Sequence, residues 1–490
     1  MGHAALEVTV IGAGLGGLSA ATHLSLAGHK VSVFEAGETA GGRANRLELD
    51  GVAFDTGPTL LNYPWIFEDL FRAAGRDFFS EVELVRVEPT VTYCWPDGVR
   101  LVLSSDPERL GAEFERLEPG AARRLQVFLA DAGEKFRIAF EKLVPQNRDN
   151  PIAYFAPLAF REILHTALWR TMYSELRRFF RSRYLCEALG TYAMYLGGSP
   201  FELPGVFTIL PYGELAHGLW LPKGGVYALV EAMERLARSC GAAIHTGCRV
   251  GRILHRNGKA AGVRLERGPE HPSPVVVSNV DLPSTFADLL DQPPPRLKMS
   301  PSALSYYWVV DEHPRGLGHH TIFLPDDYRG AFDHLNHGAG LPCKPAFYVA
   351  APGASHPGLA RPGAAPLFVL VPVPVLSRLS GVDWAAESER IQAFVLARLR
   401  ESGVALSASQ IRAERVFTPE DWRRRYALFD GSAFGAAHTL GQMGPFRARN
   451  YSRRIRGLYF TGASTTPGTG MPMVVISGRL AAERIREHVR

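Results

Sequence analysis

The chain has 490 residues, of which 46% are hydrophobic and 10% aromatic, and its formal net charge is +5 at pH 7. This apolar content is sufficient for one or more large cores and excludes a disordered chain. The small net charge, without a long basic tract, argues against nucleic acid as a partner.

The first predicted element is a dinucleotide-binding strand, turn and helix in residues 8–35. An apolar strand leads into glycines at the G-x-G-x-x-G spacing, and a second strand, Val31–Phe34, ends at Glu35. In this motif glycines permit a tight turn, a close approach to a pyrophosphate, and close packing of helix on strand. The helix N-terminus offers N–H groups to phosphates, and Glu35 is placed to accept hydrogen bonds from ribose hydroxyls. The glycines of this segment are Gly12, Gly14, Gly16 and Gly17.

A second glycine loop indicates which dinucleotide is bound. Residues 36–43 read AGETAGGR. A nicotinamide enzyme would normally continue into its next helix here, whereas a second loop carrying a cation suits the larger cofactor FAD. The strand end FDTGPTLL at 54–61 would then bring its backbone against the flavin ring. The residues expected at the cofactor in these two segments are Ala36, Gly42, Arg43, Gly57, Pro58 and Thr59.

Residues 105–190 are predicted to be mostly helical, and the part 151–186 is rich in aromatic and basic residues. It holds eight aromatic residues, and six arginines against two glutamates. Such a segment can lie on an anionic bilayer surface as an amphipathic lobe. It can equally be a set of core helices with a solvated basic face.

Residues 222–255 are expected to contribute again to the cofactor domain. This stretch predicts a helix ending near Gly241, and a hairpin follows that turns at Asn257-Gly258. Further on, short apolar runs predict a sheet that forms one wall of a substrate cleft. These runs are 305–310, 346–350 and 367–375.

The C-terminal residues 457–478 predict a buried strand, a glycine-rich turn and a helix starting near Pro472. The N-terminus of that helix would direct its N–H groups and dipole at the N1–C2=O edge of a flavin. The residues expected at the cofactor here are Gly462, Ala463, Gly470, Met471 and Met473. The cofactor domain is therefore expected to be discontinuous, built from both ends of the chain.

Together these elements predict an α/β fold with a discontinuous Rossmann-like FAD-binding domain, a mixed-sheet substrate domain and a helical lobe. The FAD domain would comprise residues 1–75, 222–285 and 431–490. The substrate domain would comprise 76–104 and 286–430. Residues 105–221 would form the helical lobe, with possible contact to a membrane.

Three blocks of the sequence resemble the bacterial-type phytoene desaturases and related carotenoid desaturases, flavoproteins of the amine-oxidase-like superfamily. The first is the N-terminal VIGAGLGGLSAA…VFEAGETAGGR…FDTGPTLL, and the last is the C-terminal GLYFTGASTTPGTGMP. The central block, 197–236, is the most specific, since it contains the family's G-h-W-h-P-[RK]-G-G run. The last block departs from the family, which often has histidine where this chain has Thr466. The residues of the central run are Gly218, Trp220, Pro222, Lys223, Gly224 and Gly225.

The resemblance implies an FAD-dependent desaturase acting on a long acyclic carotene such as phytoene or a later intermediate. A hydride would pass to the flavin while a proton leaves the neighbouring carbon. Glu214 is the candidate catalytic carboxylate, for support of developing positive charge, although a structural acid at this position is an open alternative. Related flavoproteins contact adenine through a strand that corresponds to Val250. Because no second nucleotide motif is present, quinone or oxygen is the expected electron acceptor.

Several other functions remain possible on the same fold. They are a carotenoid cis–trans isomerase, a flavin amine oxidase, and a non-catalytic prenyl-protein carrier that binds lipid and no flavin. The complete set of nucleotide-binding glycines and acids argues against the carrier, and the central Trp-x-Pro-Lys-Gly-Gly run argues against the amine oxidase.

The location in the cell is expected to be the cytoplasm, peripheral on the cell membrane. The five cysteines form no C-x-x-C pair, which argues for reduced thiols and against a metal site. The first strand begins by Glu7, so no signal peptide is expected. No uncharged apolar run reaches the length of a membrane span. A hydrocarbon substrate would still have to come from the lipid phase, hence the expected surface contact.

Overall fold

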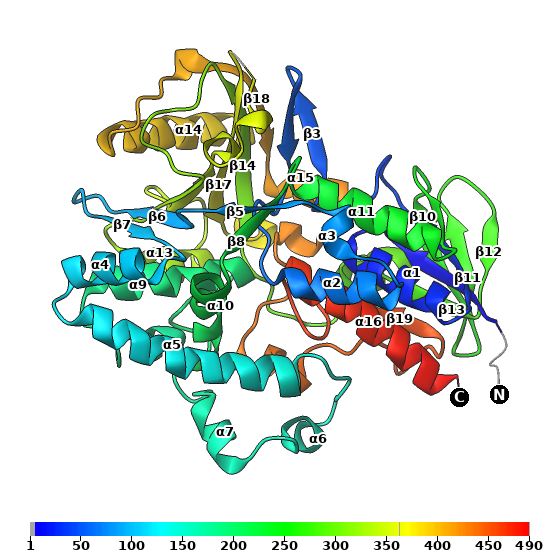
Figure 1. Cartoon of the computed structure of the whole chain (residues 1–490). Helices are drawn as coiled ribbons and strands as arrows, with labels where there is room; N and C mark the ends of the chain where they lie inside the picture. The colour runs from blue at the N-terminus through cyan, green and yellow to red at the C-terminus, as the bar shows by residue number, and fades with distance from the viewer. Residues whose placement is uncertain (1–4, 362, 490) are drawn as a thin grey trace.

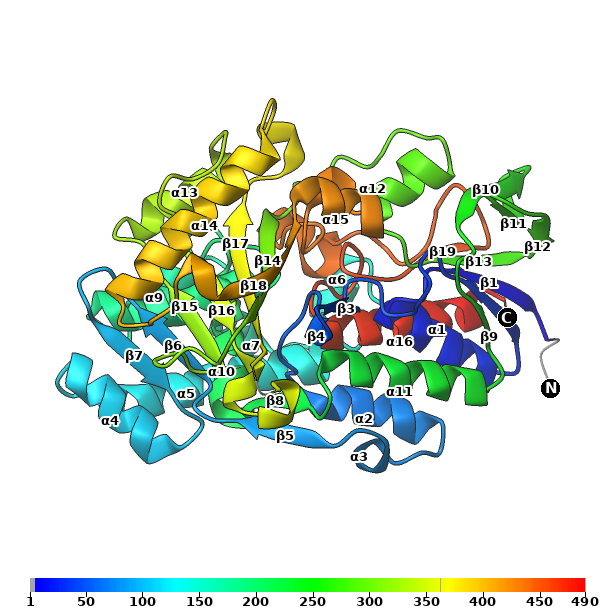
Figure 2. The ribbon, with the colours of Figure 1, turned by 90° about the horizontal axis from the view of Figure 1, so that it is seen from above.

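The computed structural model describes residues 5–361 and 363–489, and its two largest β-sheets lie side by side (Figures 1 and 2). A parallel sheet lies at the end of the molecule that carries both chain termini. A larger mixed sheet lies toward the opposite end, and helices from the middle of the chain lie beneath it in Figure 1.

The parallel sheet has five strands in the order β19-β13-β1-β2-β9. Helices pack on one face, and a small antiparallel sheet covers the other, so that the strands are apolar on both faces. The strands are β1 (Glu7–Ile11), β2 (Lys30–Phe34), β9 (Ala243–His245), β13 (Val275–Ser278) and β19 (Leu458–Phe460). The helices are α1 (Leu15–Leu26), α11 (Val226–Ser239) and α16 (Met471–His488). The strands come from three separated stretches, and the prediction of a discontinuous Rossmann-like fold is confirmed.

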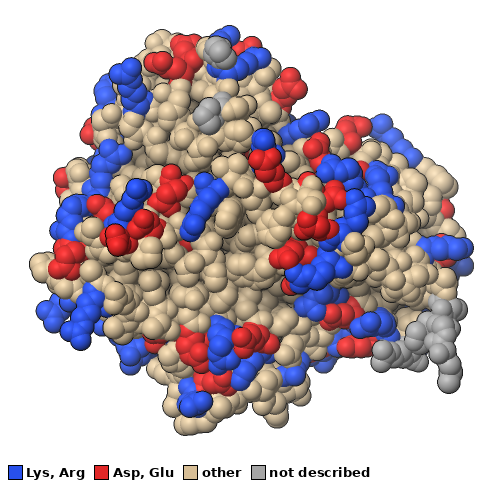
Figure 3. Space-filling model, viewed as in Figure 1, with Lys and Arg blue, Asp and Glu red and all other residues tan. Residues whose placement is uncertain are grey.

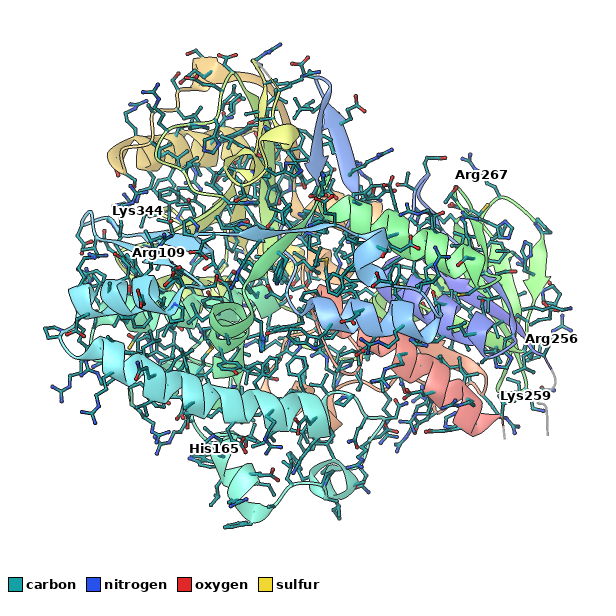
Figure 4. The ribbon with its side chains drawn as sticks, viewed as in Figure 1. Arg109, His165, Arg256, Lys259, Arg267 and Lys344 are labelled. Carbon is teal, nitrogen blue, oxygen red and sulfur yellow. The ribbon has the colours of Figure 1, made fainter. Side chains whose placement is uncertain are left out.

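The small antiparallel sheet joins β10 (Val250–Arg256), β11 (Lys259–Leu265) and β12 (Glu270–Pro272). Its predicted hairpin turn forms, because Asn257 and Gly258 both adopt positive φ angles, 50° and 69°, as a two-residue turn of this kind requires. The basic side chains of this hairpin lie at the outer edge of the molecule, where Figure 4 labels Arg256 and Lys259.

The larger sheet has seven strands in the order β18-β14-β17-β16-β15-β6-β7, antiparallel except for the pair β15 and β6. Helix α14 (Trp384–Glu401) packs on one face, against side chains such as Tyr306 and Trp308. The alternate side chains, such as Phe368 and Leu370, point to the opposite face, since successive residues of a strand alternate. The strands are β6 (Val91–Cys94), β7 (Arg100–Leu103), β14 (Ser302–Val310), β15 (His320–Phe323), β16 (Phe347–Ala350), β17 (Ala365–Val373) and β18 (Ile411–Phe417).

Helices from the middle of the chain form the predicted helical lobe. They are α4 (Pro107–Leu117), α5 (Ala121–Ile138), η1 (Ala139–Leu143), α6 (Pro151–Phe155), α7 (Phe160–His165), α8 (Met172–Leu176), α9 (Arg183–Thr191), η2 (Tyr192–Leu196), η3 (Gly205–Thr208) and α10 (Ile209–His217). Two short helices, α6 and α7, project from the body of the molecule (Figure 1). His165, labelled in Figure 4, ties α7 to α5, because its Nε2 lies 3.1 Å from the carbonyl oxygen of Asp131.

The segment 151–186 contains both buried and exposed apolar side chains. Its later aromatic Phe180 is fully buried in the core, whereas Ile152, Phe160 and Trp169 are 83%, 75% and 58% exposed. In Figure 3 acidic and basic side chains are interspersed over the visible face, and the lowest part of that face, where α7 projects, is largely uncharged. No helix in the described part of the chain is long and apolar enough to cross a membrane.

Short elements connect these parts. The strands are β3 (Arg46–Leu49), β4 (Val52–Asp55), β5 (Leu84–Val87) and β8 (Leu219–Pro222), and the helices are α2 (Pro64–Ala73), α3 (Phe78–Glu81), α12 (Leu282–Ser284), η4 (Thr285–Leu289), α13 (Tyr328–His337) and α15 (Pro419–Tyr426). Single 3₁₀ turns complete the set: η5 (Pro352–Ala354), η6 (Pro357–Leu359), η7 (Leu376–Arg378), η8 (Ala408–Gln410), η9 (Phe429–Gly431), η10 (Leu440–Gln442) and η11 (Gly444–Phe446). The limits proposed for the three domains stay a prediction.

Candidate functional site: a nucleotide cavity that continues into an apolar chamber

One cavity of about 1320 Å³ runs from the carboxyl edge of the parallel sheet to the inner face of the seven-stranded sheet. Single-ligand pockets measure roughly 300–1,000 Å³, so this cavity has room for a cofactor and a second molecule. We call the part beside the parallel sheet the nucleotide end, and the part between the helical lobe and the seven-stranded sheet the apolar chamber.

All but one of the predicted cofactor residues line this cavity. They are Gly12, Gly14, Gly16, Glu35, Ala36, Gly42, Arg43, Gly57, Pro58, Thr59, Val250, Gly462, Ala463, Gly470, Met471 and Met473. The exception is Gly17, which lies behind the wall. A Cβ atom at Gly17 would lie 2.0 Å from the carbonyl oxygen of Gly12, so glycine is needed there for close packing of α1 on the turn after β1.

Glu35 is held in a fixed position at the end of β2. Its two carboxylate oxygens accept hydrogen bonds from the backbone N–H groups of Ala13, at 2.7 Å, and Gly37, at 2.8 Å. Burial raises the pKa of Glu35, and these backbone donors oppose the rise. A carboxylate has about four acceptor positions, so Glu35 can also accept hydrogen bonds from a ribose.

Two helix N-termini point into the same cavity. Gly14 precedes α1, and Gly470 precedes α16, and the first residues of both helices line the cavity. An N-terminus offers unpaired N–H groups and the positive end of a helix dipole. The site therefore presents two places that favour negative charge, as a pyrophosphate and a reduced flavin edge require.

Arg43 belongs to a buried cluster of charges beside the cavity. Its Nη1 donates to the carbonyl oxygen of Ala433 at 2.6 Å. Burial lowers the pKa of Arg43, and the nearby Asp281 carboxylate opposes this effect. Asp281 in turn accepts hydrogen bonds from Ser464 and from the backbone N–H of Phe429. Arg43 thus lies between two loops that line the cavity.

A buried arginine, Arg447, fixes the loop that carries Gly462 and Ala463. Its guanidinium donates to five backbone carbonyls, those of Ala436, Ala437, Gln442, Ala463 and Thr465. Burial lowers the pKa of Arg447 to about 9, against the attraction of Asp281. The five hydrogen bonds therefore join the segment 436–442 to the segment 463–465.

The lobe and the seven-stranded sheet contribute only uncharged side chains to the apolar chamber, and the charged residues of the cavity wall come from other segments. Its lobe residues are Ala139, Phe140, Leu143, Val144, Tyr154, Thr191, Met194, Tyr195, Leu196, Val206, Phe207, Ile209 and Leu210, and its sheet residues are Ala303, Ile322, Ala346, Phe347, Tyr348, Phe368, Leu370 and Pro372. A cation would find no carboxylate partner among these side chains, and burial of an unpaired charge is costly. A long hydrocarbon fits this lining.

Glu214, the predicted catalytic residue, does not line the cavity. It is fully buried on α10, where it accepts hydrogen bonds from Tyr192 at 2.6 Å and from Tyr195 at 3.3 Å. Burial raises the pKa of Glu214 to about 7. Tyr195 lines the chamber and separates Glu214 from it. Glu214 therefore lies behind Tyr195, and its role as the catalytic carboxylate stays a prediction.

The Trp-x-Pro-Lys-Gly-Gly block also lies outside the cavity. Trp220 is in β8, where it stacks with Arg86, and Lys223 pairs with Glu83 on the surface. The block ends at the N-terminus of α11, where the Asp55 carboxylate caps the first N–H groups at 2.7 and 2.9 Å. The block therefore supports the fold behind Thr56–Thr59.

Other lining residues were missed by sequence reasoning. Asn279 and Asp281 line the nucleotide end directly after β13. Both residues could have been predicted from the sequence, because polar residues after a buried parallel strand lie at the carboxyl edge of the sheet, where ligands bind. His438 and Tyr348 also line the cavity, and no local pattern marks either of them.

Comparison with known proteins agrees with this geometry. The family model described as flavin containing amine oxidoreductase matches residues 15–486. The zeta-carotene-forming phytoene desaturase of Myxococcus xanthus is 39% identical over 98% of this chain and 93% of its own length. The lycopene-forming phytoene desaturase of Pantoea ananas is 32% identical over 97% of this chain and 98% of its own.

Solved structures agree on the fold. An oxidoreductase from Methanosarcina mazei superposes with a TM-score of 0.63 at 19% identity, covering 98% of this chain and 100% of its own. Putrescine oxidase superposes with a TM-score of 0.61 at 16% identity, covering 98% of this chain and 99% of its own. The helix N-termini, the fixed Glu35 and the glycine-lined turn fit FAD, the cofactor that this family uses. The chain belongs to the flavin-containing amine oxidoreductase family, in which its relatives by sequence are carotenoid desaturases.

Proposed function

We propose that the protein is an FAD-dependent carotenoid desaturase, which removes two hydrogens from adjacent carbons of an acyclic carotene. The observation that carries the proposal is the cavity, whose nucleotide end continues without interruption into a chamber of uncharged side chains. The full-length similarity to several carotenoid desaturases supports the substrate class. The uncharged chamber argues against an amine substrate, because a protonated amine would lose its hydration without gaining a partner.

The residues of the nucleotide end would hold FAD by three kinds of contact. Glu35 would accept hydrogen bonds from the adenosine ribose, and Val250 lies where its backbone can contact adenine. The N-terminus of α1 would face the pyrophosphate, and the N-terminus of α16 would face the flavin ring. FAD supplies the acceptor for a hydride.

The chamber would bind its substrate by burial of apolar surface. At about 0.8 kcal/mol per buried CH₂ group, a long hydrocarbon gains ample binding energy without any hydrogen bond. The close-packed aromatic and aliphatic walls also exclude water. Orientation of one carbon–carbon bond toward the flavin would then follow from the shape of the chamber.

We further propose that α6 and α7 rest on an anionic membrane at the cytoplasmic side. Ile152 and Phe160 are exposed on these helices, while Tyr154 of α6 lines the cavity. A hydrocarbon could pass from the bilayer to the chamber along this connection. Quinone or oxygen would accept the electrons.

Membrane contact can be tested by co-sedimentation with liposomes. We expect binding to rise with anionic lipid and to fall with salt, since charges are screened beyond about 8 Å at physiological ionic strength. Exchange of Phe160 and Trp169 for serine should weaken binding to every vesicle type. Equal binding of this variant and the wild type would contradict the proposal.

The desaturase function itself can be tested with the purified FAD-containing protein. Phytoene in liposomes, added without oxygen, should bleach the flavin and give a more conjugated carotene on extraction. Putrescine and other primary amines serve as the comparison. Bleaching by amines but not by carotenes would overturn the proposal.

A further inference from the structure

A chain of hydrogen-bonded side chains leads out of the apolar chamber. Thr59 and Tyr348 both line the main cavity, and their hydroxyl oxygens lie 2.7 Å apart. The hydroxyl of Tyr348 lies 2.6 Å from Nδ1 of His320, at the start of β15. Since Tyr348 belongs to the neighbouring strand β16, strand pairing holds the two rings together.

A second, smaller cavity lies at the far end of this chain. It measures about 120 Å³, and Thr59 and Phe368 line both cavities, so that they form the wall between them. His319 lines the smaller cavity, and its ring centre lies 4.2 Å from that of His320. We call this smaller cavity the side cavity.

The side cavity carries charged residues among an otherwise mostly apolar lining, and it reaches the surface. Arg46 and Glu231 line it, and their side chains are 60% and 44% exposed. Its volume is sufficient for a few water molecules, which also need polar partners. One such partner is His319, which lines the side cavity and whose Nδ1 is buried without a hydrogen-bond partner in the described part of the chain. Nε2 of His320, in the neighbouring ring, is likewise buried without a partner among the described residues.

We propose that Thr59, Tyr348, His320 and His319 carry the proton that leaves the substrate from the apolar chamber to the side cavity. The inference rests on the proposed desaturase function. A desaturation releases one proton for each new double bond, and a chamber that excludes water offers no solvent to accept it. A route built from side chains is therefore required.

The transfer balances as follows. Bound FAD would accept a hydride from one carbon, and the C–H bond of the neighbouring carbon would break, leaving its electron pair as the new C=C bond. The released proton goes to the hydroxyl oxygen of Thr59 or Tyr348. The hydroxyl proton of Tyr348 passes to Nδ1 of His320, and the proton on Nε2 passes on toward His319 and the side cavity.

The surroundings of the two imidazoles suit a relay that passes protons on without storing them. Burial lowers the pKa of His319 to about 4 and that of His320 well below its usual range; His313 also disfavours charge on His319, and His319 disfavours charge on His320. Both rings are therefore neutral near pH 7, and each has one nitrogen free to accept a proton. Glu214 behind Tyr195 offers no comparable exit, because its partner Tyr192 is fully buried.

The test compares Tyr348→Phe and His320→Gln with the control Tyr306→Phe. Tyr306 is also a buried sheet tyrosine, but its hydroxyl donates to the carbonyl oxygen of Ser388 on the α14 side. The measured quantity is anaerobic flavin bleaching by phytoene in liposomes, per bound FAD, in H₂O and in D₂O. We expect Tyr348→Phe and His320→Gln to bleach about 10²-fold more slowly, with a changed solvent isotope effect and an unchanged dependence on phytoene concentration. Tyr306→Phe should show the bleaching rate and the solvent isotope effect of the wild type.

A second readout does not depend on the cofactor. In ¹⁵N-histidine-labelled protein, the Nδ1 signal that disappears in His320→Gln should shift in Tyr348→Phe and stay in place in Tyr306→Phe. An unshifted signal would overturn the proposed hydrogen bond. Wild-type bleaching rates and isotope effects in both variants would overturn the relay, and so would rate losses fully accounted for by lost FAD. If the wild type itself fails to bleach with phytoene, the desaturase function fails instead.

Discussion

Replacement of Glu214 by glutamine gives a sharp test of how the buried carboxyl group behaves. Glu214 is fully buried, and its carboxylate accepts hydrogen bonds from the hydroxyls of Tyr192 and Tyr195. Glutamine has the same shape, accepts a hydrogen bond with its oxygen, and can donate to the oxygen of the second tyrosine. The exchange therefore removes the charge and leaves the packing unchanged.

The size of the effect follows from the pKa of Glu214, which burial raises from 4.5 to about 7. Each pKa unit corresponds to about 1.4 kcal/mol, so the full difference corresponds to about 3 kcal/mol. Between pH 4.5 and 7 the unfolded chain loses this proton while the folded protein keeps it, so the free energy of unfolding falls as pH rises. The contribution of Glu214 to the free energy of unfolding is thus fully present below pH 4.5 and lost above pH 7.

We expect the free energy of unfolding of Glu214→Gln to equal that of the wild type near pH 4.5. At pH 8 it should exceed the wild-type value by up to about 3 kcal/mol. The measurement is the unfolding temperature of both proteins, with equal FAD content, at several pH values from 4.5 to 8.5. A difference in unfolding temperature that does not vary with pH would refute the reasoning. Because Glu214 lies behind Tyr195, the flavin bleaching rate per bound FAD should fall less than tenfold. A 10²-fold loss would show that the Glu214 charge contributes directly to the reaction.

Three further exchanges test the cofactor end of the cavity. Glu35→Ala should lose FAD during purification, since the carboxylate at the end of β2 is removed; a normal ratio of flavin to protein absorbance would contradict this placement. Gly17→Ala should give little soluble protein, because the added Cβ would lie 2.0 Å from a carbonyl oxygen, whereas Gly441→Ala, with open space around its Cβ, should express normally. Arg447→Met should lower the stability by roughly 3–5 kcal/mol and reduce FAD content, because five buried carbonyls lose their donor. The exposed Arg267→Met is its control, and equal unfolding temperatures of the two variants would show that the five hydrogen bonds contribute nothing.

The sequence by itself determined the nucleotide end of the molecule. Each signal there is local: glycines at fixed spacing, a strand that ends at Glu35, and a helix that begins near Pro472. Local backbone geometry follows from such residues regardless of the rest of the chain. For that reason the strands, the helices and most lining residues of this end could be predicted from the sequence, with Asn279 and Asp281 as exceptions.

Only the tertiary structure decided which residues face the apolar chamber. Glu214 lies in a segment that resembles the family, yet α10 turns its side chain away from the cavity and against Tyr192. Tyr348 and His320 are ordinary residues of two apolar strands, and strand pairing alone brings them within 2.6 Å. A continuous apolar run does not reveal which alternate side chain faces the helix and which the cavity, since both faces of the sheet are buried. Packing of the helical lobe and α14 against opposite faces settles that choice, and it involves contacts far apart in the sequence.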